Sequence, residues 1–183
     1  MIFGEKKRYV MTVDTKRCVG CNSCVIACKQ ENRLPPGATR DWIVTETQGI
    51  FPALSQEIRS ERCNHCSKSP CVSACPTGAS YVSTGGIVLV NHDKCTGCKA
   101  CIAACPYEAR YVHPKGHVDK CTFCIHRVQK GGLPACVETC PTKALRFGDL
   151  NDSESEVARL LSSREWKTLN PGTGARPNVY FLI

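Results

Sequence analysis

The sequence of 183 residues contains no long apolar run and few apolar side chains from which to build a core. None of its apolar stretches approaches the roughly 18 to 20 residues that a membrane-spanning helix needs. Hydrophobic residues make up 42 % of the chain, but this share includes 16 cysteines, and only about a third of the chain is apolar without them. We therefore expect something other than apolar burial to help hold the fold together.

Targeting and catalytic signals are also missing. Residues 1–8 are charged, and the mixed segment 9–13 ends at Asp14, so no signal peptide is recognised. No Ser/His/Asp set, phosphate-binding loop or dinucleotide fingerprint stands out. We assign no catalytic residue and expect a soluble or peripheral polypeptide.

The charge is unbalanced, with 24 Lys and Arg against 16 Asp and Glu and a formal net charge of +8. If all thiols were neutral, this excess would favour nucleic acid or an anionic membrane surface as a partner. Four oxidised [4Fe-4S] cores, each with four thiolates, would instead add about −2 apiece and bring the net charge close to zero. The basic side chains would then be internal counter-charge, and we expect no nucleic-acid partner.

The 16 cysteines form four blocks of four with none left over. Blocks one and three have the spacing C-x2-C-x2-C-x3-C that bacterial ferredoxins use for [4Fe-4S] clusters. In this pattern three thiolates hold one cluster, and the fourth, usually followed by Pro, points to a different cluster. All 16 are candidate iron ligands: Cys18, Cys21, Cys24 and Cys28 in block one; Cys63, Cys66, Cys71 and Cys75 in block two; Cys95, Cys98, Cys101 and Cys105 in block three; Cys121, Cys124, Cys136 and Cys140 in block four.

Blocks two and four depart from this spacing without losing a ligand. Block two widens one gap to four residues, and block four inserts residues 125–135 between its second and third cysteines. The insertion costs little, because the entropy of loop closure grows only with the logarithm of loop length. Pro follows the last cysteine of every block except the first, where Lys29 takes its place. The complete set predicts four [4Fe-4S] clusters.

Three other interpretations of the cysteines are weaker. Disulfides are disfavoured because cysteines two residues apart on tight turns have poor disulfide geometry, and cystine scaffolds are usually shorter. Block four alone, with two Cys pairs separated by eleven residues, could form a zinc ribbon, but its three neighbours argue against zinc. A three-iron cluster would need a missing ligand, whereas the count is complete.

The segments around the blocks are typical of small ferredoxin units, with a strand, a ligand loop and a short helix that starts within or just after the third ligand. Beyond Gly148, the pattern Ser153-x-x-Glu156 predicts a capping box and a helix of about ten residues. We interpret the tail as a packing strap in preference to a docking segment. The predicted strands are 8–14, 42–47, 56–62, 87–90, 144–147 and 178–183, and the predicted helix of block one is 23–32.

Longer motifs point to a family. They are HVDKCTFC at 117–124, PACVETCP at 134–141 and CPYEAR at 105–110. With the order of the blocks, they resemble the four-cluster electron-transfer subunit of molybdopterin oxidoreductases, closest to the polysulfide, thiosulfate, tetrathionate and dimethyl sulfoxide reductase type. The resemblance covers nearly the whole chain, from Tyr9 to Leu182.

The resemblance implies an α+β fold of two bacterial-ferredoxin-like modules, one nested in the other and related by a pseudo-two-fold axis. The outer module would comprise residues 1–55 and 113–150, the inner module 56–112, and the C-terminal strap 151–183.

The resemblance also implies crossed ligation. Spacing alone leaves sequential pairing open, although the 19-residue gap between Cys75 and Cys95 mildly favours pairing block two with block three. The implied ligand sets are site A with Cys18, Cys21, Cys24 and Cys140; site B with Cys28, Cys121, Cys124 and Cys136; site C with Cys63, Cys66, Cys71 and Cys105; and site D with Cys75, Cys95, Cys98 and Cys101.

The implied function is electron relay. Clusters with every corner held by thiolate have no open site for substrate. Site A would face a molybdenum bis-pterin catalytic subunit, and site D a polytopic quinone-binding membrane subunit, in anaerobic respiration. Some relatives lack a cysteine at the position of Cys98 and carry a three-iron cluster, so its presence here predicts four cubanes.

The resemblance places the chain on the periplasmic face of the cytoplasmic membrane, held there through its partner, with a cytoplasmic location as the alternative. The alternative function is that of the corresponding subunit in a soluble formate dehydrogenase or hydrogenase complex, or of a free polyferredoxin.

Basic side chains and histidines near the ligands could raise cluster potentials. Each is more simply a solvated or satisfied group, and we expect His65 and His126 to be such groups. The basic residues beside ligands are Lys16, Arg17, Lys29, Lys68, Lys94, Lys99, Lys120 and Arg127.

Overall fold

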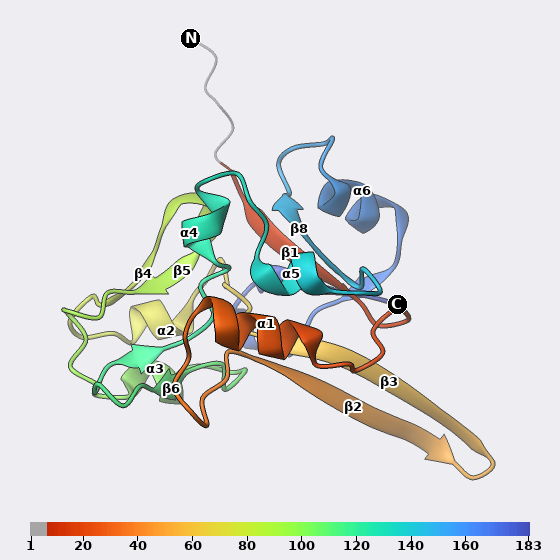
Figure 1. Ribbon diagram of the computed structural model, residues 1–183, viewed down its shortest axis with the longest axis horizontal. Coiled ribbons are helices and arrows are strands. Elements are labelled where there is room, and N and C mark those ends of the chain that lie inside the picture. The colour runs from red at the N-terminus through yellow and green to blue at the C-terminus, as the bar shows by residue number, and fades with distance from the viewer. Residues whose placement is uncertain (1–6) are drawn as a thin grey trace.

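The computed structural model describes residues 7–183, so most of the N-terminal segment without a signal pattern lies outside the described residues. Its main sheet has the strand order β8 (Leu145–Asp149), β1 (Tyr9–Asp14), β10 (Val179–Leu182) and β9 (Trp166–Lys167). β1 runs antiparallel to β8 and parallel to β10, so the first and last strands are neighbours in one sheet (Figure 1).

β1 is buried on both faces of this sheet. Met11 and Val13 belong to the main apolar cluster, whereas Val10 packs against Val157 and Tyr180 on the other side. Successive side chains of a strand point to opposite faces, so a strand covered on both sides is apolar at nearly every position. This confirms the strand predicted ahead of block one, within one residue.

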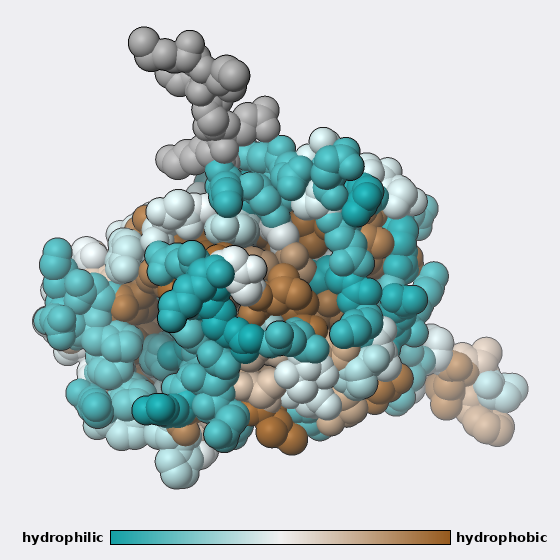
Figure 2. Space-filling model, turned by 45° about the horizontal axis from the view of Figure 1, so that its top comes forward, coloured by the Kyte–Doolittle hydropathy of each residue, from teal (hydrophilic) through white to brown (hydrophobic). Residues whose placement is uncertain are grey.

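The predicted strands at 42–47 and 56–62 are the two halves of one long hairpin. β2 (Asp41–Ile50) pairs antiparallel with β3 (Ala53–Arg62) along its whole length, and the hairpin projects from the body of the protein (Figure 1). The prediction was too short because residues 48–55 lack an apolar/polar alternation. Figure 2 shows the apolar tip, where Ile50 and Phe51 are 85 % and 83 % exposed.

Each cysteine block contains one short helix, which carries the third cysteine of that block. These helices begin one residue before the third cysteine in every block, which confirms the predicted start at residue 23 in block one and is slightly earlier than the general pattern predicted for the other blocks. α1 contacts α5, and α2 contacts α3, so block one packs with block four and block two with block three. The helices are α1 (Ser23–Glu31), α2 (Pro70–Ser73), α3 (Ala100–Ala103) and α5 (Ala135–Thr139).

The remaining elements are small. β5 begins at Val88, one residue later than the predicted strand 87–90, and ends at Val90 as predicted. Two short antiparallel pairs flank blocks two and three, and the sequence indicated only β5 among them. The elements are β4 (Ser80–Val82) with β5 (Val88–Val90), β6 (Tyr111–Val112) with β7 (Val118–Asp119), α4 (Ile125–Val128), and the 3-10 turns Thr84–Gly86 and Pro171–Thr173.

The tail crosses from block two to the main sheet. Its helix α6 (Glu156–Ser163) is capped by Ser155, whose Oγ accepts the N–H of Ala158 at 3.2 Å, so the predicted capping box at Ser153 was wrong. Further on, Ser67 N–H donates to Arg176 O at 2.8 Å, and the chain then continues into β10. No helix among residues 7–183 is both long and apolar enough to cross a membrane.

Candidate metal centres

The cysteines of site A line one cavity. Cys18 and Cys21 lie in the loop before α1, Cys24 is in its first turn, and Cys140 follows α5. Burial raises the pKa of Cys18, and the neighbouring sulfurs of Cys140 and Cys21 raise it further. Ligands from blocks one and four therefore face the same space, as the packing of α1 on α5 requires.

The cysteines of site B line a second cavity between the same two blocks. Burial raises the pKa of Cys28, and the Cys121 sulfur adds to this rise. The Asn32 amide donates to Cys28 Sγ at 3.7 Å and to Cys124 Sγ at 3.9 Å, so one side chain bridges ligands from both blocks.

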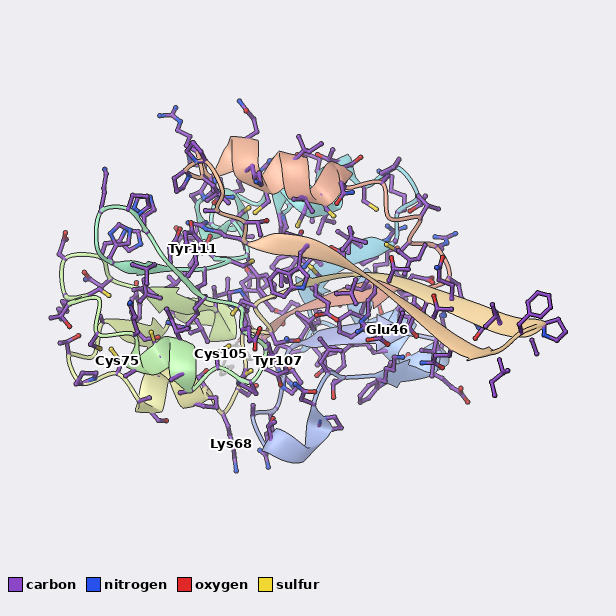
Figure 3. All side chains as sticks on the ribbon, turned by 90° about the horizontal axis from the view of Figure 1, so that it is seen from below. Glu46, Lys68, Cys75, Cys105, Tyr107 and Tyr111 are labelled. Carbon is purple, nitrogen blue, oxygen red and sulfur yellow. The ribbon has the colours of Figure 1, made fainter. Side chains whose placement is uncertain are left out.

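Site C brings block two together with the last cysteine of block three. Burial raises the pKa of Cys66 to about 12, and the sulfurs of Cys63, Cys71 and Cys105 contribute to the rise. Tyr107, two residues after Cys105, lies beside it in Figure 3, and burial together with the Cys66 sulfur raises its pKa to about 12.

Site D is the least closed of the four sets. Cys95 and Cys101 pack with Val88 and Val118 in one apolar cluster. Cys98 is exposed, and Cys75 follows α2, which contacts α3. This ligand set, like the other three, stays a prediction.

Left-handed backbone conformations shape the ligand loops. The residue before the second cysteine has a positive φ in every block, namely Gly20 (67°), His65 (43°), Gly97 (69°) and Phe123 (50°). Such conformations turn successive N–H groups inward and form concave anion sites. Phe123 N–H, for example, donates to Cys121 Sγ at 3.4 Å. Glycine indicates this turn in two blocks, but nothing in the sequence marks His65 and Phe123.

Buried basic side chains were the main feature that the sequence did not indicate. Arg62 Nη1 donates to Cys136 Sγ at 3.4 Å, and Arg110 Nη2 donates to Cys71 Sγ at 2.9 Å. Lys120 is 1 % exposed, so its interpretation as a solvated side chain was wrong.

The two histidines differ. His126 is half exposed and contacts Glu31, as expected of a surface group. His65 is fully buried, and its Nδ1 accepts the N–H of Val88 at 3.1 Å. Its Nε2 has no partner among residues 7–183, so His65 is not the satisfied group that we expected.

Unpartnered buried donors provide a test of whether a cluster fits. Nε of Arg62, and Nε and Nη1 of Arg110, are buried without a hydrogen-bond partner among residues 7–183. An unsatisfied buried polar group costs about 1 to 3 kcal/mol, and more if it is charged. Anionic iron-sulfur clusters, whose sulfurs accept hydrogen bonds, fit this environment. Within the same residues, no three His, Cys, Asp or Glu side chains meet as they would around a single metal ion.

Two models of the 4Fe-4S dicluster domain match the chain, one at residues 54–150 and one at 17–79. Protein NrfC of Escherichia coli strain K12 is 46 % identical over 177 residues, which is 94 % of this chain and 79 % of NrfC. The chain belongs to the four-cluster iron-sulfur subunits of molybdopterin oxidoreductases.

Subunits of two named reductases are also similar to this iron-sulfur subunit. One, from the selenate reductase of Mesobacillus selenatarsenatis, is 39 % identical, with 96 % of this chain and 72 % of the relative covered. The other, from the tetrathionate reductase of Salmonella typhimurium, is 41 % identical, with 97 % and 73 % covered. The family, its ferredoxin-type mixture of helices and strands, and its four [4Fe-4S] clusters agree with the prediction from the cysteine blocks.

Proposed function

We propose that this iron-sulfur subunit relays electrons between a quinone-linked membrane subunit and a molybdenum bis-pterin catalytic subunit in anaerobic respiration. Relatives named as subunits of selenate and tetrathionate reductases support a reductase partner. When bound, [4Fe-4S] clusters supply one-electron transfer without a site for substrate. The residues of the chain hold the clusters, shield them from water and set their electrostatic environment.

The exposure of the cysteines carries this proposal. Cys21 of site A and Cys98 of site D are exposed. Every cysteine of sites B and C is buried or only partly exposed. This pattern is expected of an electron-transfer chain whose first and last clusters contact partner subunits and whose middle clusters are shielded from solvent.

The crossed ligand sets A to D are part of the proposal. The two cavities that mix blocks one and four support sites A and B, and the clustered sulfurs around Cys66 support site C. The packing of α1 on α5 and of α2 on α3 supports an outer and an inner module related by a pseudo-two-fold axis.

The proposed bounds of the modules rest on the same pairing of block one with block four and of block two with block three. The outer module is 1–55 with 113–150, the inner module is 56–112, and 151–183 forms the strap. The bound at 55/56 falls within β3, so this strand connects the two modules. Backbone hydrogen bonds between residues 175–178 and 64–68 support the strap.

Site A is the end that would face the catalytic subunit, and site D the end nearest the quinone-binding membrane subunit. The periplasmic face of the membrane is the proposed location, reached through the partner. Because the chain offers no membrane-spanning helix within residues 7–183, attachment through a polytopic partner is consistent with the fold.

Co-purification and electron transfer test this function. The complex should contain a polytopic membrane protein and should pass electrons between a quinol analogue and the catalytic subunit. Full activity as a soluble pair would instead favour a formate dehydrogenase or hydrogenase complex, and isolation without partners would favour a polyferredoxin.

Serine variants test the ligand sets. Cys28→Ser should alter the same electron paramagnetic resonance (EPR) signal as Cys136→Ser, and a different one from Cys24→Ser. If Cys28→Ser and Cys24→Ser altered the same signal, the crossing of blocks one and four would be excluded.

A further inference from the structure

Three basic side chains are buried among the ligands. Arg62, Arg110 and Lys120 are 2 %, 6 % and 1 % exposed. Cations are seldom buried this completely unless they are paired with a negative group. Arg62 pairs with Asp41 at 3.1 Å, but among residues 7–183 no carboxylate lies within ion-pair distance of the other two cations. Their counter-charge must come from another source.

Arg62 lies between sites A and B. Its Nη1 donates to Cys136 Sγ of site B at 3.4 Å. Its Nη2 bonds the Ser60 hydroxyl, and Ser60 Oγ lies 3.3 Å from Cys24 Sγ of site A. Burial acts to lower the pKa of Arg62, but Asp41 and the sulfurs of Cys136 and Cys24 outweigh it and raise the pKa.

Arg110 occupies the equivalent place between sites C and D. Its Nη2 donates to Cys71 Sγ of site C at 2.9 Å and to Ser80 Oγ at 2.8 Å. Burial acts to lower its pKa, whereas the sulfurs of Cys71 and of Cys101 in site D raise it. In both modules, therefore, an arginine lies between the third cysteines of the two paired blocks.

Lys120 lies between sites B and C, because it directly precedes Cys121 of site B, and Val88, whose carbonyl oxygen it contacts, packs with Cys71 of site C in one apolar cluster. Its Nζ donates to Cys121 O at 2.6 Å and to Val88 O. Its positive charge acts to lower the pKa of Cys121 in site B and of Cys71 in site C, against the dominant effect of burial.

We propose that Arg62, Lys120 and Arg110 form a series of buried cations, one in each gap between consecutive clusters, which raises the reduction potential of the two clusters that each cation separates. This inference rests on the ligand sets given under Proposed function. A cluster becomes more negative on reduction, so a fixed positive charge beside it stabilises the reduced form. The same charge lowers the repulsion between two neighbouring reduced clusters.

The low exposure of these residues explains why they, and not the surface lysines beside other ligands, have this role. Water and salt screen an exposed charge, whereas a buried charge acts at a much lower effective dielectric constant. Lys99 provides the matched comparison, because it is exposed and directly follows Cys98 of site D.

The test is an EPR-monitored redox titration of the anaerobically purified full-length protein. In Arg110→Gln, the reduced-to-oxidised ratio at a given potential should fall at least tenfold for sites C and D, which corresponds to about 59 mV for one electron. Sites A and B should not change. In Arg62→Gln, the ratio should fall for sites A and B and stay unchanged for sites C and D. In Arg110→Lys, sites C and D should keep reduction potentials close to those of the wild type.

Lys99→Gln is the control and should shift no cluster by more than about threefold, because its charge is screened. If Arg110→Gln left the potentials unchanged, or shifted all four clusters equally, the proposal would be overturned. The iron content of the wild-type protein distinguishes a failure of the cation proposal from a failure of the proposed function. A wild-type chain without four clusters would contradict the proposed function itself.

A measurement on the wild-type chain keeps the proposal testable if a variant loses its clusters. In protein labelled with 15N at the arginine guanidinium groups, pulsed EPR of the reduced clusters should detect a 15N coupling, because Arg62 and Arg110 donate directly to ligand sulfur. This coupling should disappear from the signals of sites C and D in Arg110→Lys. The absence of any guanidinium coupling in the wild type would overturn the proposal.

Discussion

The imidazole ring of His65 stacks on the phenyl ring of Phe123, with ring centroids 3.7 Å apart and an angle of 24° between the planes. The two residues hold the same position in their blocks, immediately before the second cysteine, and both have a positive φ. Nearby, the Cys63 sulfur of site C acts to raise the pKa of Cys121 in site B. Block two and block four therefore meet through equivalent residues, at the place where site B adjoins site C.

Phe123→Ala should destabilise the junction between these two blocks. Phe123 is 1 % exposed and belongs to the main apolar cluster, and truncation of a buried phenylalanine costs about 3 to 5 kcal/mol. We expect a lower midpoint for the thermal bleaching of cluster absorbance. Phe51→Ala at the exposed hairpin tip is the control and should leave the midpoint unchanged. Equal midpoints for the two variants would contradict this prediction.

Gly97→Ala should prevent assembly of the site D cluster. Gly97 has φ 69°, and a Cβ there would clash with the carbonyl oxygen of Gly116. Gly78→Ala is a matched control, because Gly78 has φ 63° but no atom lies within 4 Å of its added Cβ. Both variants place alanine in a left-handed backbone conformation, which costs about 1 to 2 kcal/mol. Only in Gly97→Ala does the new Cβ also clash with a backbone atom. Iron analysis should show a loss of about a quarter of the iron in Gly97→Ala alone; full iron content would refute the expected clash.

Asp14 should link the stability of the tail to pH. Its carboxylate pairs with Arg164 and accepts the N–H of Lys16 at 3.1 Å. Burial acts to raise the pKa of Asp14, but the hydrogen bond and charge of Arg164 outweigh it and lower the pKa below the usual 3.8. A lowered carboxyl pKa stabilises the fold above the usual value, and this contribution is lost as the pH falls through the lowered pKa.

Asp14→Asn should therefore reduce the free energy of unfolding at pH 7 by about 1.5 to 3 kcal/mol, the range for hydrogen bonds to charged groups. Denaturant titrations of the chelated, iron-free chain at several pH values measure this difference, because acid would release the sulfide of the clusters from the loaded protein. The difference should shrink below the usual carboxyl pKa. Asp93→Asn, at an exposed carboxylate, is the control. A difference that does not depend on pH would mean that the charge of Asp14 has no part in the effect.

Removal of iron should unfold the inner module before the main sheet. Four of the nine buried residues in the apolar clusters around sites C and D are cysteines, and the others are Tyr107 and a few small or aliphatic residues. The main sheet has further apolar contacts, including Val10 with Val157. After chelation under reducing conditions, hydrogen exchange should accelerate first in residues 63–112, while the amides of β1 and β10 stay protected. Uniform protection of the chelated chain would contradict this expectation.

Local patterns explain which parts of the fold could be predicted from the sequence. The ligand spacing identified all the cysteine blocks, and the strands predicted at 8–14 and 178–183 correspond to β1 and β10. The hairpin β2–β3 was underestimated because its outer half is solvated and its pairing depends on strand register instead of apolar burial. Ser155 took the capping role predicted for Ser153, since its hydroxyl lies at the N-cap of α6.

The two buried arginines could not be predicted because their sequence neighbours are not their spatial partners. Arg62 directly precedes Cys63 of site C, yet its side chain contacts Cys136 of site B. Arg110 belongs to the motif that ends block three, yet it donates to Cys71 of block two. Only the three-dimensional crossing of the blocks distinguishes these arginines from the exposed Lys99.

Mössbauer spectroscopy of the anaerobically isolated chain, together with iron and acid-labile sulfide analysis, tests the central claim most directly. We predict about 16 iron and 16 sulfide per chain, all in the spectrum of oxidised [4Fe-4S] clusters, from the 16 cysteines of the four blocks. A colourless chain that contains zinc, or one with iron for fewer than four clusters after anaerobic handling, would contradict the account.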